Sequence, residues 1–157
     1  MLKNPIIKNI LSAIGVAGLG FILLNLAFML DFFFQSAVIW CIKLFTSANP
    51  SMDWPWFPPA MYVAFVILIG LLSWFIFRSK LGVFYKATFM AVPLAAVFVT
   101  IGMFLYRWPI IVYSLGGLFF LGVLYYFYRT KQPWLYYYTL ILIGLVMLIV
   151  GLLGVEI

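Results

Sequence analysis

The sequence predicts an all-α polytopic membrane protein. We expect a five-helix transmembrane bundle with an extracytoplasmic amphipathic or re-entrant helix between the first and second spans. The chain of 157 residues is 68% hydrophobic and only 8% charged, so it carries more apolar surface than a soluble domain of this size can bury. Its apolar runs are about 20 residues long, the length that crosses a hydrocarbon core. The charged residues stand as singles or pairs at the ends of these runs, which is typical of membrane helices.

We expect a single transmembrane domain over residues 1–157. Its spans are predicted at residues 10–30, 60–77, 83–105, 109–128 and 134–155. The first run is too long for a signal-peptide core and no small-x-small cleavage motif follows it, so it is retained as a span. Prolines precede or open the second, fourth and fifth spans, where a missing amide proton costs little.

The segment from residue 31 to residue 59 separates the first span from the other four. Asp31 is expected to end the first span. Residues 32–46 are apolar but too short to cross a bilayer, and their polar residues gather on one broad face of a helix, so we expect a surface or re-entrant helix. Prolines in residues 48–59 exclude a regular helix there, which predicts an aromatic-rich loop.

Small side chains recur three or four residues apart in several spans. Such spacing lets a second helix approach closely, which is how helices associate in lipid. The predicted helix-packing positions are Gly15, Gly18, Ala87, Ala91, Ala95, Gly144 and Gly151.

The distribution of basic residues predicts the orientation. With the N-terminus in the cytoplasm, the C-terminus lies outside and most of the basic residues face the cytoplasm. These cytoplasmic residues are Lys3, Lys8, Arg78, Lys80, Lys86, Arg129 and Lys131. Lys43, Arg107 and all three acids then face outward. The expected location is a plasma (inner) membrane, with the mitochondrial inner membrane as the alternative.

Missing residue types argue against most chemistry. The chain has no histidine and Cys41 is its single cysteine, so the usual general base and cysteine-based metal clusters are unavailable. If Asp31 ends the first span, no acid lies within a span to carry protons. We therefore expect no enzymatic activity, no metal and no cofactor. The net charge of +6 is spread along the chain rather than gathered in a patch, so we expect no nucleic-acid partner.

Three classes of function remain open. The first is a non-catalytic accessory subunit or partner-binding component of a membrane complex, whose partners are membrane lipid and another membrane protein or a second copy. The second is a protein that binds a lipid or an apolar small molecule, and the third is a small transporter or channel component.

The outer segment is the predicted ligand or partner surface. Its residues are Asp31, Phe33, Trp40, Trp54, Trp56, Phe57 and Arg107. We expect Asp31 and Arg107 to pair across the outer ends of the helices and to hold the aromatic loop over the bundle. In the alternative, residues 32–46 lie free in the headgroup layer and the tryptophans are interfacial anchors.

The run Trp56-Phe57-Pro58-Pro59, at the start of the second span, resembles the W-x-P-P motif of the translocator, or tryptophan-rich sensory, protein family. That family also has five spans, and the resemblance implies binding of tetrapyrroles and other apolar ligands. The match covers these residues and the gross topology. The asparagine, glutamine and tryptophan positions of that family's third and fifth helices are absent from residues 87–105 and 140–155.

Overall fold

A computed structural model describes residues 5–46 and 54–153 of the chain. It contains five helices: α1 (Pro5–Phe45), α3 (Phe57–Arg78), α4 (Val83–Leu105), α5 (Pro109–Arg129) and α6 (Trp134–Leu152). No strand occurs in the described residues, and each of the five helices is long and apolar enough to cross a membrane. The prediction of an all-helical chain with five candidate spans is therefore confirmed.

The expected break at Asp31 is absent, because α1 runs without interruption from Pro5 to Phe45. Residues 21–45 contain neither proline nor glycine, so no residue stops the helix. The side-chain amide of Gln35, one turn after Asp31, donates to the Asp31 carboxylate at 2.9 Å. The prediction of a separate helix over residues 32–46 was wrong. It assumed that Asp31 ends the first span, but α1 continues through this acid.

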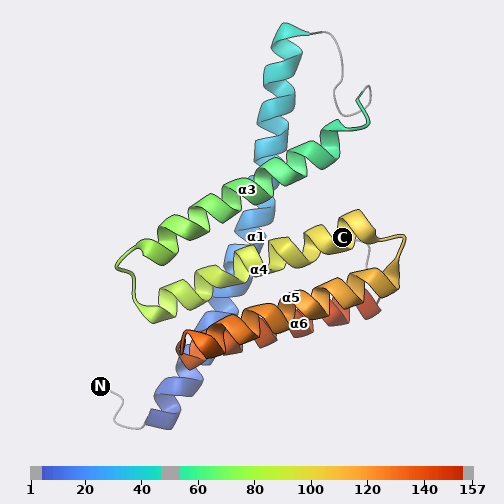
Figure 1. The fold of residues 1–157 in the computed structure, drawn as a ribbon. Helices are drawn as coiled ribbons and strands as arrows, with labels where there is room; N and C mark the ends of the chain where they lie inside the picture. Colours follow the sequence, from blue (N-terminus) through green and yellow to red (C-terminus); the bar gives the residue numbers. More distant parts are fainter. Residues whose placement is uncertain (1–4, 47–53, 154–157) are drawn as a thin grey trace.

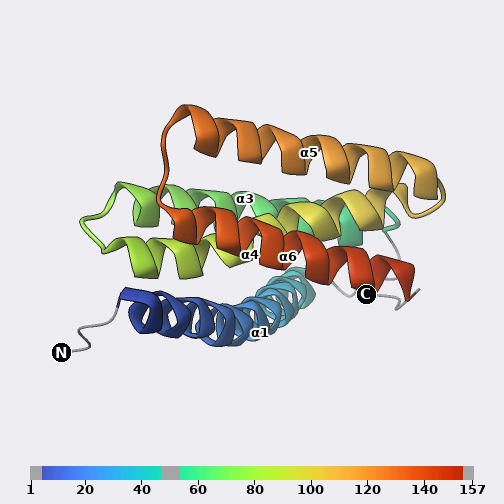
Figure 2. The ribbon, with the colours of Figure 1, turned by 90° about the horizontal axis from the view of Figure 1, so that it is seen from below.

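The helix α4 lies at the centre of the molecule and contacts each of the other four described helices. The helices α3, α4, α5 and α6 run back and forth in antiparallel succession (Figure 1). Seen from below, α1 and α5 lie on opposite sides of α4 (Figure 2), and Figure 1 shows that α1 crosses the other helices steeply. The arrangement places residues of α1, α3 and α4 around one crossing point.

Small and medium apolar residues fill the centre of the bundle. On α4, Ala87, Ala91 and Ala95 are buried, and from α1 Val16 reaches the same cluster. On α6, Leu140 and Thr139 are fully buried, and the Thr139 hydroxyl contacts the backbone of α4. Most large side chains on the outer faces are exposed, as expected for helices whose solvent is lipid.

Short turns fix the order of the helices. Between α3 and α4, the Lys86 ammonium donates to the carbonyl oxygen of Phe77 at 2.8 Å and so ties the start of α4 to the end of α3. Between α5 and α6, Lys131 adopts a left-handed backbone conformation (φ 49°) and the Gln132 amide donates to the carbonyl of Phe127 at 3.0 Å. Turns of this length hold consecutive helices side by side.

Candidate functional site

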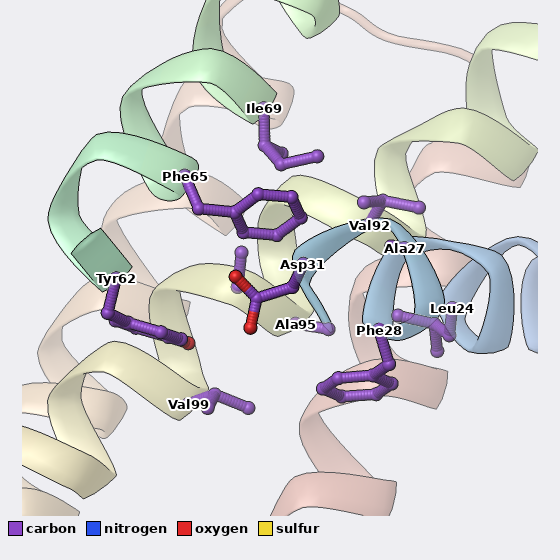
Figure 3. A pocket seen from close by; sticks show the side chains of 11 residues that line it. Leu24, Ala27, Phe28, Asp31, Tyr62, Phe65, Ile69, Val92, Ala95 and Val99 are labelled. Atoms are coloured by element: carbon purple, nitrogen blue, oxygen red, sulfur yellow. The ribbon is translucent and has the colours of Figure 1, made fainter. Parts of the chain in front are cut away.

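Asp31 lies inside the bundle, at the point where α1 crosses α3 and α4. Its carboxylate points between Tyr62 and Phe65 of α3 and Val99 of α4 (Figure 3). Asp31 lines a small cavity of about 30 Å³. Apart from Asp31 and Tyr62, the lining is apolar: Leu24, Ala27, Phe28, Phe65, Ile69, Val92, Ala95, Ala96 and Val99. This is the one cavity of the described residues into which an acid points, so it is the candidate site.

The two carboxylate oxygens of Asp31 are in different environments. Oδ2 accepts the hydrogen bond from the Gln35 side-chain amide. Oδ1 is buried and has no hydrogen-bond partner among the described residues. A buried polar atom without a partner costs free energy, on the order of 1–3 kcal/mol and more for a charged group. The site therefore lacks one donor.

Tyr62 of α3 faces Asp31 across the cavity (Figure 3). Thr100 on α4 donates its own hydroxyl proton to the carbonyl of Ala96 at 2.6 Å. The Tyr62 side chain lies within hydrogen-bonding reach of the Thr100 side chain. The Tyr62 hydroxyl forms no hydrogen bond with Oδ1 of Asp31.

The site lies below the ends of the helices that surround it. At 1.5 Å per residue, Tyr62 is roughly 8 Å from the start of α3 at Phe57, and Val99 is roughly 9 Å from the end of α4 at Leu105. The neighbouring ends are on the same side of the bundle. Asp31 therefore lies about one and a half turns inside the apolar length of these helices. The expectation that no acid lies within a candidate span was wrong, since α1 does not end at Asp31.

Arg107 lies apart from this site, in the turn after α4. Its Nε donates to the hydroxyl oxygen of Tyr106 at 2.9 Å, and its guanidinium lies over the same ring, 5.6 Å from the centroid. The hydrogen bond to Tyr106 raises the pKa of Arg107 above its ordinary value. Asp31 and Arg107, both within the described residues, form no ion pair, because each has a partner on its own segment and α1 carries Asp31 into the bundle.

The predicted aromatic residues are divided between two places. At the start of α3, Trp54 stacks on Trp56 with ring centroids 5.8 Å apart, and Phe57 contacts both rings at their edges. Phe57 is buried, whereas Trp56 is exposed. Phe33 and Trp40 are exposed on α1 and contact none of these three rings. The structure therefore brings Trp54, Trp56 and Phe57 together but not all of the predicted surface.

The predicted small-residue positions also differ in their surroundings. A Cβ built on Gly15 would lie 3.0 Å from the Phe84 ring, and one on Gly144 would lie 2.8 Å from the Phe120 ring. Gly151 approaches the Tyr113 hydroxyl, with 3.4 Å from a built Cβ to that oxygen. Gly18 has no such neighbour within 4 Å. Ala87, Ala91 and Ala95 lie buried along α4, with Ala95 also lining the Asp31 cavity.

A second feature is the end of α1 beyond Asp31. There α1 rises past α3 with no other labelled helix alongside it (Figure 1). An open, nearly flat apolar surface follows one face of this end. Its lining residues are spaced alternately three and one apart: Phe34, Ala37, Val38, Cys41, Ile42 and Phe45. We call these six residues the α1 stripe.

The sequence contained signals for part of the Asp31 site. The four-residue spacing of Asp31 and Gln35 is typical of a hydrogen bond within one helix, and it argues for a helix that continues through both. Tyr62 was not singled out, because only the packing of α3 against α1 brings it to Asp31. Comparisons of the chain with models of protein families, with curated proteins and with solved structures find no match, so no relative assigns a role to either feature.

Proposed function

We propose that this chain is a non-catalytic accessory subunit of a membrane complex and that it binds a helix of another membrane protein along the α1 stripe. The observation that carries this proposal is the exposed apolar surface of α1 beyond Asp31. Beyond Phe34, whose ring contacts Phe65 of α3 at 6.2 Å, large side chains of α1 such as Trp40 and Phe45 are exposed. The stripe is thus a continuation of the contact between α1 and α3.

The pattern of the stripe supports a helix as the partner. Positions three and four residues apart lie on one face of a helix, as Phe34, Ala37 and Cys41 do, and such a face is a seam that a second helix can fill. Ala37 and Cys41 are small and one turn apart, which lets a second backbone come close. Lipid chains solvate any apolar surface and give no reason for such a seam. Phe33 and Trp40 are exposed and both lie to one side of the stripe.

The length of α1 supports the same proposal. Its 41 residues extend roughly 60 Å, about twice the thickness of a hydrocarbon core. Because α1 crosses the other helices steeply, its end beyond Asp31 extends past α3 (Figure 1). A subunit that holds a partner beside its own bundle needs an arm of this kind.

For the setting, we propose a plasma (inner) membrane with the N-terminus in the cytoplasm and the C-terminus outside. The support is the bias of basic residues given above. The mitochondrial inner membrane is the alternative location. The stripe then belongs to the extracytoplasmic half of the molecule.

Site-specific photocrosslinking tests the proposed interface. A photoreactive amino acid at Val38, on the stripe, should give one discrete protein adduct in native membranes. The same residue at Ser36, on the opposite side of α1, is the matched control and should give none. Mass spectrometry identifies the adduct. Equal labelling at both positions, or adducts with lipid alone, would reject a specific partner helix.

A transporter or channel component is the second candidate, and Asp31 is the observation that favours it. Ionisable residues within membrane helices commonly mark routes for ions or protons. Proton or ion flux in reconstituted vesicles, compared between the native chain and Asp31→Asn, tests this candidate; equal flux in both counts against it. Binding of a lipid or a tetrapyrrole receives less support, because the cavity of about 30 Å³ is far smaller than ligand pockets of about 300–1,000 Å³.

A further inference from the structure

We propose that the turn between α3 and α4 binds the headgroup of an anionic phospholipid, with Arg78, Lys80 and Lys86 around its phosphate. We call these three residues the basic turn. The proposal goes beyond partner binding along the α1 stripe and rests on other residues. The ligand is a lipid of the leaflet at this end of the bundle.

Basic residues gather at this end of the molecule. Figure 2 shows the α3–α4 and α5–α6 turns at the same end, beside the start of α1. The hydrogen bond from Thr139 of α6 to Ala87 of α4 places the starts of these two helices at the same level. On α1, Gly15 approaches the Phe84 ring near the start of α4. The six basic residues at this end are Lys8, Arg78, Lys80, Lys86, Arg129 and Lys131.

No acid of the described residues lies near these charges. The only acid among them is Asp31, which lines its cavity together with Tyr62. Roughly 24 Å of α3 separates Tyr62 from Arg78. The described part of the chain therefore supplies no counter-charge at this end, and the field of the basic residues attracts an anion from outside.

Two cations of the basic turn are held in place by neutral groups. The Lys86 ammonium donates to the carbonyl oxygen of Phe77 at 2.8 Å, and the Arg78 guanidinium lies 5.0 Å from the centroid of the Trp74 ring. These contacts restrict both side chains without cancelling their charges. Each cation keeps further N–H donors, and Lys80 is exposed in the same turn. The basic turn is thus partly ordered before an anion arrives, which lowers the entropy lost on binding.

The surroundings of the basic turn identify the anion as a lipid headgroup. Trp74 and Tyr85 are exposed beside it, and such side chains gather at the level of the headgroups. Further into the membrane, α3 exposes the apolar side chains of Leu71 and Phe75. A phospholipid fits both parts, with its phosphate at the cations and its acyl chains along α3, whereas a soluble anion leaves the apolar part unused. Basic sites at the ends of membrane helices are typical places for anionic headgroups.

Native mass spectrometry of the folded chain, released from detergent with added lipid, tests the proposal. The probes are phosphatidylglycerol and phosphatidylcholine with the same acyl chains. Phosphatidylglycerol should bind more tightly, because its headgroup carries a net negative charge. Arg78→Gln should weaken its binding about fivefold, and Arg78→Gln combined with Lys86→Gln about 25-fold, since each basic residue contributes about equally. Equal affinity of the native chain for the two lipids would overturn the proposal.

Arg107→Gln is the matched control. Arg107 also lies over an aromatic ring, 5.6 Å from the Tyr106 centroid, but in the turn at the other end of α4. This variant should bind phosphatidylglycerol as the native chain does, and Arg78→Lys should keep most of the binding because the charge remains. An equal loss in Arg107→Gln and Arg78→Gln would reject the basic turn as the site.

Competition and folding complete the experiment. Glycerol phosphate at millimolar concentration should not displace the lipid; displacement would identify the ligand as a soluble anion and overturn the proposal. Lys86→Gln also removes the bond to Phe77. If the double variant does not fold, Arg78→Gln decides, because it leaves that bond in place, and unchanged binding in Arg78→Gln would count against the site.

Discussion

The hydroxyl of Thr139 on α6 donates to the backbone carbonyl of Ala87 on α4, at 3.2 Å. The same hydroxyl also lies 3.0 Å from the carbonyl of Leu135 in its own helix. Thr139 and Ala87 are both fully buried, so this bond joins two helices where no water can replace it.

Thr139→Val should therefore destabilise the bundle. The substitution keeps the shape of the side chain and removes the hydrogen bond, and interhelical hydrogen bonds in membranes average about 0.6 kcal/mol with a maximum of about 1.7 kcal/mol. Unfolding in mixed detergent measures the loss. Thr130→Val is the control, since the Thr130 hydroxyl is exposed and bonds only within α5 and its cap. Equal losses in both variants would show that the interhelical bond contributes nothing.

Gly144→Ala should destabilise the contact between α5 and α6. The new methyl carbon would lie 2.8 Å from the Phe120 ring, which must move, and overpacking of this kind costs about 1–3 kcal/mol. Gly117→Ala is the control, because no atom lies within 4 Å of its built Cβ, and alanine favours the helix by about 1 kcal/mol over glycine. Phe120→Leu in the Gly144→Ala background should restore part of the loss. Unchanged melting temperature in Gly144→Ala would contradict the close approach.

Ala91→Leu should loosen the crossing of α1 over α4. Ala91 is buried, and a Cβ built on Gly20 of α1 would lie 3.5 Å from the Ala91 methyl carbon. A larger side chain pushes the two backbones apart, with an expected cost of about 1–3 kcal/mol. Ala64→Leu, on the exposed face of α3, makes the same change without a neighbouring helix and should be neutral. The prediction fails if the two variants melt at the same temperature.

Ser79 and Arg107 should be accessible from opposite sides of the membrane. They follow α3 and α4 respectively, so the whole length of α4 separates them. In a Cys41→Ser background, Ser79→Cys should react with an impermeant thiol reagent from the cytoplasmic side and Arg107→Cys from the other side. Thr130→Cys, after α5, should react from the same side as Ser79→Cys. Labelling of Ser79→Cys and Arg107→Cys from one side would refute the five-span arrangement.

The sequence was sufficient to predict the helices whose ends carry clear signals. Pro109 and Pro133 mark the starts of α5 and α6, and α4 has the predicted bounds of residues 83–105. The end of α1 was misjudged because an acid can end a span or lie buried within one, and local sequence does not distinguish the two. What decides is the neighbourhood of Asp31, which includes residues from distant parts of the chain such as Tyr62 and Val99.

The candidate site was accordingly predictable only in part. Asp31 was named as a functional residue, but its expected partner was Arg107, on the reasoning that the remaining charges gather at one interface. Asp31 instead accepts a hydrogen bond from Gln35 in the same helix, which needs no second segment of the chain. Arg107 contacts the ring and the hydroxyl of the adjacent Tyr106.

The central position of α4 has a consequence for biosynthesis. During synthesis α1 and α3 leave the ribosome first, yet α4 is the helix against which both pack most extensively. Until α4 has been inserted, Gly20 and Asp31 on α1 lack the α4 residues that lie beside them in the finished molecule. The nascent chain therefore passes through a stage in which an acid faces lipid or the insertion machinery. Chains that terminate before α4 would be obvious substrates for membrane quality control.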